Sequence, residues 1–153
     1  AFMIRAPGIT KPGTTCSEPV CSIDFYPTIL DLCGQAAPKE KTLDGVSLQP
    51  LLRGEESLDR ESLYWHYPHY SNQGGFPGGA IREGDWKLVE RYEDGQVHLY
   101  NLKEDIGELN DVASQNAQRV AAMRDRLHRW YKDVDAKFLQ PKDGQQPWHP
   151  FED

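Results

Sequence analysis

The chain has no uninterrupted apolar run approaching the ~20 residues that a helix needs to cross a bilayer, so we expect no membrane-spanning segment in it. It also lacks an excess of positive charge, because 17 lysines and arginines stand against 24 aspartates and glutamates, giving a formal net charge of −7. A surface of that sign repels phosphate backbones, and no basic stripe is clustered along the chain, so we expect no nucleic-acid partner. An anionic substrate would meet the same repulsion, and a face that binds one must therefore gather positive charge locally.

Cysteine is scarce, and Cys16, Cys21 and Cys33 are the only three, at no spacing typical of a metal site. Buried or free thiols are the simpler interpretation, and a disulfide between two of the three is the alternative. The count leaves the redox compartment open.

The composition that is present suits a folded protein. Of the 153 residues, 38% are hydrophobic and 27% are charged, which leaves room for one domain, or for a smaller domain plus part of another. The first part of the chain, residues 1–53, predicts a strand at residues 2–5, a helix from Ser22 to just before Gly34, and a helical turn at residues 47–52. One strand and these helices are too few to bury one another, so we interpret this part as the edge of a larger α/β sheet.

Residues 54–140 predict a second, more regular domain, and the prolines beyond it mark an irregular tail at residues 141–153. Alternating apolar residues and short glycine-containing connections predict four antiparallel strands, at residues 62–67, 79–83, 86–92 and 96–100. A long helix follows, from a cap at Ser114 to about residue 138, and its continuous apolar stripe needs a sheet to cover. The expected fold class is α+β: a small four-stranded antiparallel sheet packed by one long C-terminal helix, preceded by a strand-and-helix remnant of a larger α/β domain.

Strand alternation assigns side chains to the two faces of this sheet. On the helix side we expect Leu63, Trp65, Ile81, Trp86, Leu88, Val97 and Leu99. On the opposite side we expect Tyr64, His66, Arg82, Lys87, His98 and Tyr100. That second face is mixed aromatic and basic, which is typical of a surface that lies against a neighbouring domain.

Five short motifs occur in a fixed order along the chain. They are Pro-Gly-x-x-Lys-Pro-Gly at residues 7–13, Ser-x-Asp-x-x-Pro-Thr at 22–28, Leu-Asp-Gly-Val-Ser at 43–47, Ile-Arg-Glu-Gly-Asp-Trp-Lys-Leu at 81–88 and Leu-Tyr-Asn-Leu at 99–102. Each motif is weak alone, but the ordered set resembles the C-terminal third of the type I, formylglycine-dependent sulfatases of the alkaline-phosphatase superfamily. By this resemblance, residues 1–53 are a remnant of the large sulfatase α/β domain.

In that family a hydroxyl of the formylglycine attacks sulfur, and a calcium ion stabilises the charge that develops. The formylglycine is made from the first residue of a Cys/Ser-x-Pro-x-Arg motif, which this chain lacks; at residues 17–21, Cys21 stands where the arginine is required. The nucleophile and the calcium ligands lie upstream in the family's order, so we assign no catalytic and no metal-binding residue here. The resemblance implies a C-terminal fragment of a sulfatase that shapes the substrate pocket and is inactive alone.

The resemblance also implies the partners. They are an upstream sulfatase catalytic domain, which would carry the calcium and the formylglycine, and a sulfated carbohydrate or aryl sulfate in the parent enzyme, which by family analogy is exported. Self-association through residues 1–34 is a further expectation if the strand and helix there stay uncovered. Two other interpretations stay open: a stand-alone, non-catalytic glycan-binding or protein-interaction module, and a structural fragment with no independent role.

Residues 65–79, between the first two predicted strands, combine imidazoles, aromatic rings, amides and glycines, which are groups that bind sugars. We therefore expect His66, His69 and Asn72 to contact the sugar that bears the sulfate. The alternative is a loop whose polar groups satisfy its own backbone. His66 and His69 could also be half of a metal site, but zinc needs three or four ligands and no second cluster is near in sequence.

Arg82 and Lys87 are the cations that we expect to face a sulfate or a sugar carboxylate. The alternative for each is a salt bridge to one of the many acidic residues. Asp24, two residues into the first predicted helix, is expected to bind backbone N–H groups rather than to act in catalysis.

Overall fold

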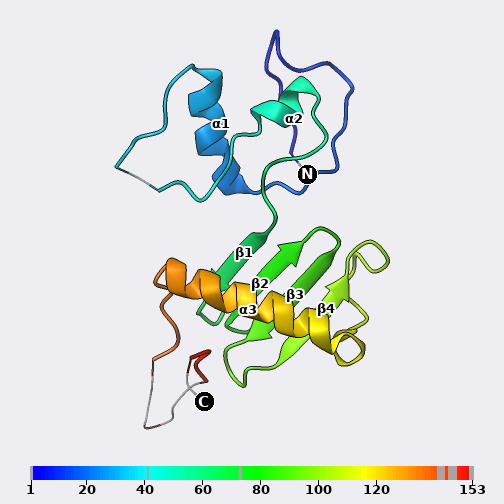
Figure 1. Cartoon of the computed structure of the whole chain (residues 1–153), viewed down its shortest axis with the longest axis vertical. Coiled ribbons are helices and arrows are strands. Elements are labelled where there is room, and N and C mark those ends of the chain that lie inside the picture. Colours follow the sequence, from blue (N-terminus) through cyan, green and yellow to red (C-terminus); the bar gives the residue numbers. More distant parts are fainter. Residues whose placement is uncertain (1, 41, 73, 141–143, 145–147, 152–153) are drawn as a thin grey trace. The chain divides into compact units, whose positions relative to one another are not determined.

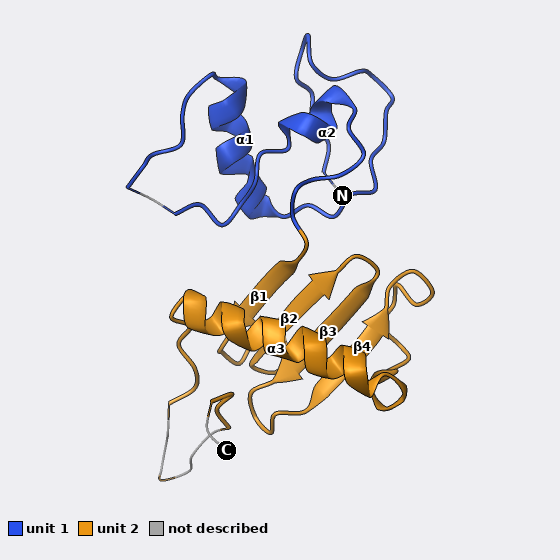
Figure 2. Cartoon of the chain, in the orientation of Figure 1, with its two compact units in different colours: residues 1–60 blue, residues 61–153 orange. Residues whose placement is uncertain are grey.

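The computed structural model describes residues 2–40, 42–72, 74–140, 144 and 148–151. The chain divides into two units, residues 1–60 and residues 61–153 (Figure 2). The described part of the chain contains no helix that is long and apolar enough to span a membrane.

The first unit is built from short helices. A single turn of 3-10 helix, Ser22–Asp24, continues into α1, Phe25–Leu32, and α2, Gln49–Arg53, follows later in the chain. Both predicted helical segments are therefore confirmed. Gly34 ends α1 as predicted, because its φ of 65° turns the chain so that the N–H of Gln35 donates back to a carbonyl in the last turn of the helix.

The predicted strand at residues 2–5 is wrong. These residues have no regular secondary structure, and the ring of Phe2 instead packs against that of Phe25, with 4.7 Å between the ring centroids. A strand is stable only beside a partner that satisfies its backbone hydrogen bonds. Residues 2–40 and 42–60 provide no such partner.

Asp24 ties distant segments of the first unit together. Its side chain is fully buried and accepts hydrogen bonds from the backbone N–H groups of Cys21 (2.8 Å) and Val46 (3.0 Å) and from the guanidinium of Arg60 (2.7 Å). Burial by itself raises the pKa of Asp24, but the hydrogen bonds from Arg60 and the two N–H groups outweigh it, so this pKa lies below its ordinary value. The expectation that Asp24 binds backbone N–H groups is confirmed.

The second unit is a four-stranded antiparallel sheet with one face covered by a helix (Figure 1). The strands are β1, Leu63–Tyr67; β2, Gly78–Glu83; β3, Trp86–Arg91; and β4, Val97–Asn101, and they lie in this order across the sheet. A turn of 3-10 helix, Ala113–Gln115, leads into the covering helix α3, Ala117–Asp133. The four predicted strands, the long helix and the α+β fold are confirmed.

The core of the second unit lies between α3 and the sheet. Its most deeply buried residues, each 0% or 1% exposed, include Ile81, Leu88, Leu99, Met123, Leu127 and Tyr131. The three from the sheet form one row, because the register places them opposite one another on β2, β3 and β4. α3 ends earlier than predicted, at Asp133. The chain then turns at Asp135, whose φ is 51°, and Phe138 reaches the core from outside the helix.

The predicted face assignment is confirmed for β2, β3 and β4, and it is wrong for β1. The register pairs Tyr64 with Ile81, so Tyr64 and His66 lie on the helix face and Leu63 and Trp65 lie on the opposite face. The prediction for β1 is shifted by one residue, because leucine and tryptophan are more apolar than tyrosine and histidine and were therefore assigned to the helix face. Rings with a polar tip can nevertheless pack under a helix when their polar atoms find partners.

Replacing a residue of this core should destabilise the second unit. We expect Leu127→Ala to lower the free energy of unfolding by about 2–5 kcal/mol, because it leaves a cavity between α3 and the sheet. Urea denaturation followed by circular dichroism measures the loss. Leu109→Ala is the control, because Leu109 is 84% exposed and its loss should change stability by no more than about 0.5 kcal/mol. Equal stability of the two variants would contradict this packing.

Candidate functional site

The loop between β1 and β2 presents two of the predicted sugar-binding residues. His69 and Asn72 are both exposed. The ring of His69 stands edge-on to that of Tyr67, with 5.5 Å between the centroids. Gly74 and Gly75 follow with φ of 89° and 99°, a left-handed conformation that glycine adopts without strain. The loop therefore holds an imidazole and an amide that a ligand can reach.

His66 has a different setting. Its Nδ1 lies 2.6 Å from the hydroxyl of Tyr92, and its Nε2 lies 2.8 Å from the backbone carbonyl of Lys137. Because a carbonyl only accepts, Nε2 carries a proton and donates it to the Lys137 carbonyl. Burial lowers the pKa of His66; the hydrogen bond to the Lys137 carbonyl opposes this, and the charge of His69 adds to it. Both ring nitrogens are thus engaged within the second unit.

Arg82 and Lys87 lie opposite each other on the uncovered face of the sheet. The Nζ of Lys87 donates to both carboxylate oxygens of Glu108, at 2.6 and 2.8 Å, so the salt bridge considered for Lys87 is present. The Nε of Arg82 donates to the carbonyl of Gly84 at 3.1 Å. Among the described residues no carboxylate pairs with Arg82, and its guanidinium is the unpaired cation of this face.

A hollow of about 470 Å³ lies on this uncovered face. It brings Arg82 and Lys87 together with an apolar lining that includes Trp65, Phe76, Ala80, Val89, Leu102 and Ile106. Of the five residues that we expected to meet the substrate, Arg82 and Lys87 line it. His69 and Asn72 belong to the exposed loop, and His66 belongs to the helix face.

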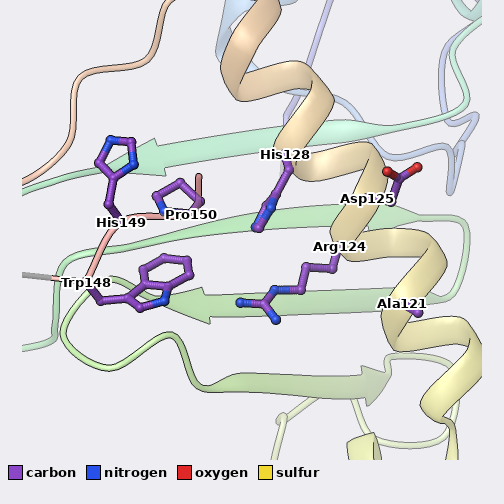
Figure 3. Close-up of a pocket in the computed structure, with 7 residues that line it drawn as sticks. All are labelled: Ala121, Arg124, Asp125, His128, Trp148, His149 and Pro150. Carbon is purple, nitrogen blue, oxygen red and sulfur yellow. The ribbon is translucent and has the colours of Figure 1, made fainter. Parts of the chain in front are cut away.

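A second hollow, of about 350 Å³, lies beside α3 (Figure 3). Its lining residues are Ala121, Arg124, Asp125 and His128 of the helix and Trp148, His149 and Pro150 of the C-terminal segment. Figure 3 shows Arg124 extending from α3 toward the indole of Trp148, and the guanidinium carbon lies 5.6 Å from the ring centroid. Cationic and aromatic groups meet here, but Arg124 and His128 already have an internal partner.

That partner is Glu90 of β3, which is 0% exposed. Its carboxylate accepts hydrogen bonds from Nε of Arg124 at 2.7 Å and from Nε2 of His128 at 2.8 Å. The sequence analysis missed this cluster. The available signal was the position of Glu90, which continues the inward alternation of Trp86 and Leu88 and so places a carboxylate in the core, where it needs a charged partner.

The described residues contain no group of three or more His, Cys, Asp or Glu side chains that could hold a metal ion. Cys16, Cys21 and Cys33 are all free thiols, as the simpler interpretation held. The described side chains therefore offer no calcium site, and the sequence holds no formylglycine motif, so we derive no catalytic step from them.

This chain is similar to known proteins over most of its length. The family described as N-sulphoglucosamine sulphohydrolase, C-terminal, matches residues 1–136. A sulfatase of Formosa agariphila is 32% identical over 84% of the chain and 26% of its own length. An N-acetylglucosamine-6-O-sulfatase of Bacteroides thetaiotaomicron is 29% identical over 88% of the chain and 25% of its own length. The chain thus spans about a quarter of the length of these relatives.

Solved structures are similar as well. One, a protein in complex with its substrate D-glucosamine-2-N,6-O-disulfate, superposes with a TM-score of 0.73 at 29% identity, over 86% of this chain and 28% of that one. A phosphonate monoester hydrolase of Silicibacter pomeroyi superposes with a TM-score of 0.66 at 30% identity, over 84% of this chain and 28% of that one.

The buried setting of His66 predicts a pH effect on folding. Because its pKa in the folded chain lies below the ordinary value of about 6.5, the unfolded chain binds the proton more readily. The stability that neutral His66 contributes is therefore complete above pH ~6.5 and is lost as the pH falls through the lowered pKa. We expect His66→Gln to lose less stability than the unmodified chain between pH 7.5 and 5.5, measured by urea denaturation. The other four histidines are common to both proteins, so identical losses would contradict this account.

Proposed function

Because the chain belongs to the C-terminal family of the N-sulphoglucosamine sulphohydrolases, within the sulfatases of the alkaline-phosphatase superfamily, we propose that it serves as the C-terminal part of a sulfatase. A sulfatase is a sulfuric ester hydrolase. The observation that carries the proposal is the match across residues 1–136 in a chain that has no Cys/Ser-x-Pro-x-Arg motif. The nucleophile, and the calcium ligands that stabilise charge on the sulfate, would then belong to the rest of the enzyme, and this chain alone would be inactive.

The second unit would shape the substrate pocket. Arg82 supports this role, because an unpaired guanidinium offers charge-assisted hydrogen bonds to a sulfate or a carboxylate. His69 and Asn72 support it as exposed donors and acceptors for sugar hydroxyls. A sugar contact by His66 stays a prediction. It would require the ring to give up its hydrogen bond to Tyr92 or to Lys137.

The substrate class would be a sulfated carbohydrate. A relative named as an N-acetylglucosamine-6-O-sulfatase and a structural neighbour bound to D-glucosamine-2-N,6-O-disulfate favour a sulfated amino sugar over an aryl sulfate. The local positive charge that an acidic chain needs for such a substrate is available at Arg82.

A stand-alone binding module is not our proposal, because the relatives described above, which match most of this chain, are named as sulfatases. Self-association through residues 1–34 remains a proposal for the isolated chain. It rests on exposed apolar side chains in that segment, which include Phe2, Met3 and Ile29 at 43%, 100% and 59% exposure.

A chimeric enzyme tests the proposed site. In it, this chain replaces the aligned quarter of the Bacteroides thetaiotaomicron N-acetylglucosamine-6-O-sulfatase. We expect Arg82→Gln to lower kcat/KM for a sulfated glucosamine about tenfold to a hundredfold, the loss of one or two charge-assisted hydrogen bonds. His69→Ala and Asn72→Ala should each lower it about tenfold, because each removes a single hydrogen bond.

Arg129→Gln is the matched control, because Arg129 is exposed on α3 and forms an ion pair with Asp125 one turn away on the same helix. It should leave kcat/KM unchanged. An active chimera in which Arg82→Gln behaves like Arg129→Gln would refute the substrate role of Arg82. A folded chimera with no activity would count against the proposal that this chain completes such an enzyme.

A further inference from the structure

The loop between β1 and β2, residues 68–77, carries His69 and Asn72. Its two ends meet, because the register pairs Tyr67, the last residue of β1, with Gly78, the first residue of β2. Pairing at the base closes the loop but leaves its interior free to sample many conformations, and fixing them costs entropy. Contacts from another part of the chain are therefore needed to hold the loop in one arrangement.

Tyr92, which directly follows β3, contacts both ends of this loop. Its backbone N–H donates to the carbonyl of Pro77 at 2.9 Å, where the loop ends. Its hydroxyl oxygen lies 2.6 Å from Nδ1 of His66, just before the loop begins. Tyr92 is 0% exposed, so water does not compete for either group. One buried residue thus joins the start of the loop to its end.

A glycine makes room for this contact. Gly79 is the cross-strand partner of His66. A Cβ on Gly79 would lie 2.5 Å from the hydroxyl oxygen of Tyr92 and closer still to that of Tyr131, so any side chain there would push both rings away. The space that a side chain would fill is taken by the hydroxyl that reaches His66. The contact is therefore built into the sheet and is not a chance surface contact.

The residues before and after that tyrosine hold the outer part of the loop. The hydroxyl of Tyr70 donates to a carboxylate oxygen of Glu93 at 3.1 Å. The guanidinium carbon of Arg91 lies over the ring of Phe76, 5.1 Å from its centroid. Three consecutive residues therefore contact the loop or its ends at the start, in the middle and at the end. We call these residues, 91–93, the brace.

The carboxylate of Glu93 is itself held in place. One of its oxygens accepts from Tyr70, and the other accepts from Nη2 of Arg91 at 2.9 Å. Because each oxygen has a donor, the orientation of the carboxylate is fixed. The hydrogen bond to Glu93 raises the pKa of the Tyr70 hydroxyl, which therefore stays protonated and able to donate at physiological pH.

We propose that the brace positions the loop for the sugar, so that Tyr92 and Glu93 are positioning residues of the substrate site. This inference rests on the proposed function, in which His69 and Asn72 bind sugar hydroxyls, and adds to it the residues that hold them. Tyr70, which Glu93 bonds, lies between His69 and Asn72 in the sequence. A loop that is held in its binding arrangement before the sugar arrives loses less entropy on binding, and the sugar binds more tightly.

Amide hydrogen exchange on the isolated chain tests whether the brace holds the loop. We expect Tyr92→Phe to speed exchange in peptides covering residues 68–77 at least about fivefold, because the hydroxyl that reaches His66 is gone. Tyr131→Phe is the matched control, because it also removes the hydrogen bond between the two tyrosine hydroxyls but leaves the one to His66. Loop exchange should change by less than about twofold in that variant. Equal acceleration in the two variants would contradict the role of Tyr92.

Tyr70→Phe tests the outer contact without disturbing the core, because Tyr70 is 65% exposed. It should speed exchange of the same peptides about twofold to fivefold, since it removes only the hydroxyl that bonds Glu93.

Kinetics of the chimera described above test whether the brace acts on substrate binding. Glu93→Ala and Asp94→Ala remove the same charge from neighbouring positions, and both carboxylates pair with Arg91, but Tyr70 bonds Glu93. We expect Glu93→Ala to raise KM for a sulfated glucosamine about threefold to tenfold and to change kcat less than about twofold, because it weakens binding without touching the chemistry. Asp94→Ala should change KM less than about twofold. In a Tyr70→Phe background Glu93→Ala should have little further effect, because both act through one hydrogen bond.

Two results would overturn the inference. One is unchanged loop exchange in both Tyr92→Phe and Tyr70→Phe. The other is a normal KM for Glu93→Ala in a chimera that His69→Ala impairs. Exchange requires no turnover, so an inactive chimera beside a loosened loop in Tyr92→Phe would count against the proposed function while supporting the brace.

Discussion

The packing of α3 on the sheet is the interaction on which the second unit depends. Met123, Leu127 and Tyr131 of the helix meet the row Ile81, Leu88 and Leu99, and all six are essentially inaccessible to solvent. A four-stranded sheet of short strands has little stability alone, so this apolar layer fixes the register of the sheet. It also decides which side chains are left on the other face. Because Ile81 and Tyr64 point toward the helix, their neighbours Arg82 and Trp65 lie on the opposite face of the sheet, where they line the hollow.

Several polar side chains are buried inside this layer, and each needs hydrogen-bond partners there to offset its loss of hydration. Tyr92 and Tyr131 place their hydroxyl oxygens 2.9 Å apart, and the Tyr92 hydroxyl also bonds His66. Burial raises the pKa of both tyrosines, so both stay neutral at physiological pH. Glu90, buried beside them, is compensated by Arg124 and His128. A buried carboxylate that lost these partners would be strongly destabilising, which explains why α3 carries basic residues on a side that faces the sheet.

The sequence predicted the elements of the second unit because each has a strong local signal: alternation in the strands, glycine-containing turns between them, and one helical stripe. It failed where the outcome depends on tertiary partners. Tyr64 and His66 lie under the helix because Trp130 stacks on the first and Tyr92 and Lys137 bond the second, and no local pattern encodes these contacts. The strand expected at residues 2–5 had no partner. For the site, residue types predicted a sugar-binding loop and a substrate-facing Arg82, and only the fold separated exposed His69 from enclosed His66.

The central claim is that this chain is the part of a sulfatase that does not carry out the chemistry. The most direct test is a sulfate-release assay on the purified 153-residue chain, with calcium present and with both a sulfated glucosamine and an aryl sulfate as substrates. The account predicts no release above that of buffer at any concentration of the chain. Release that saturates with substrate, scales with the concentration of the chain and disappears when the chain is unfolded would contradict it.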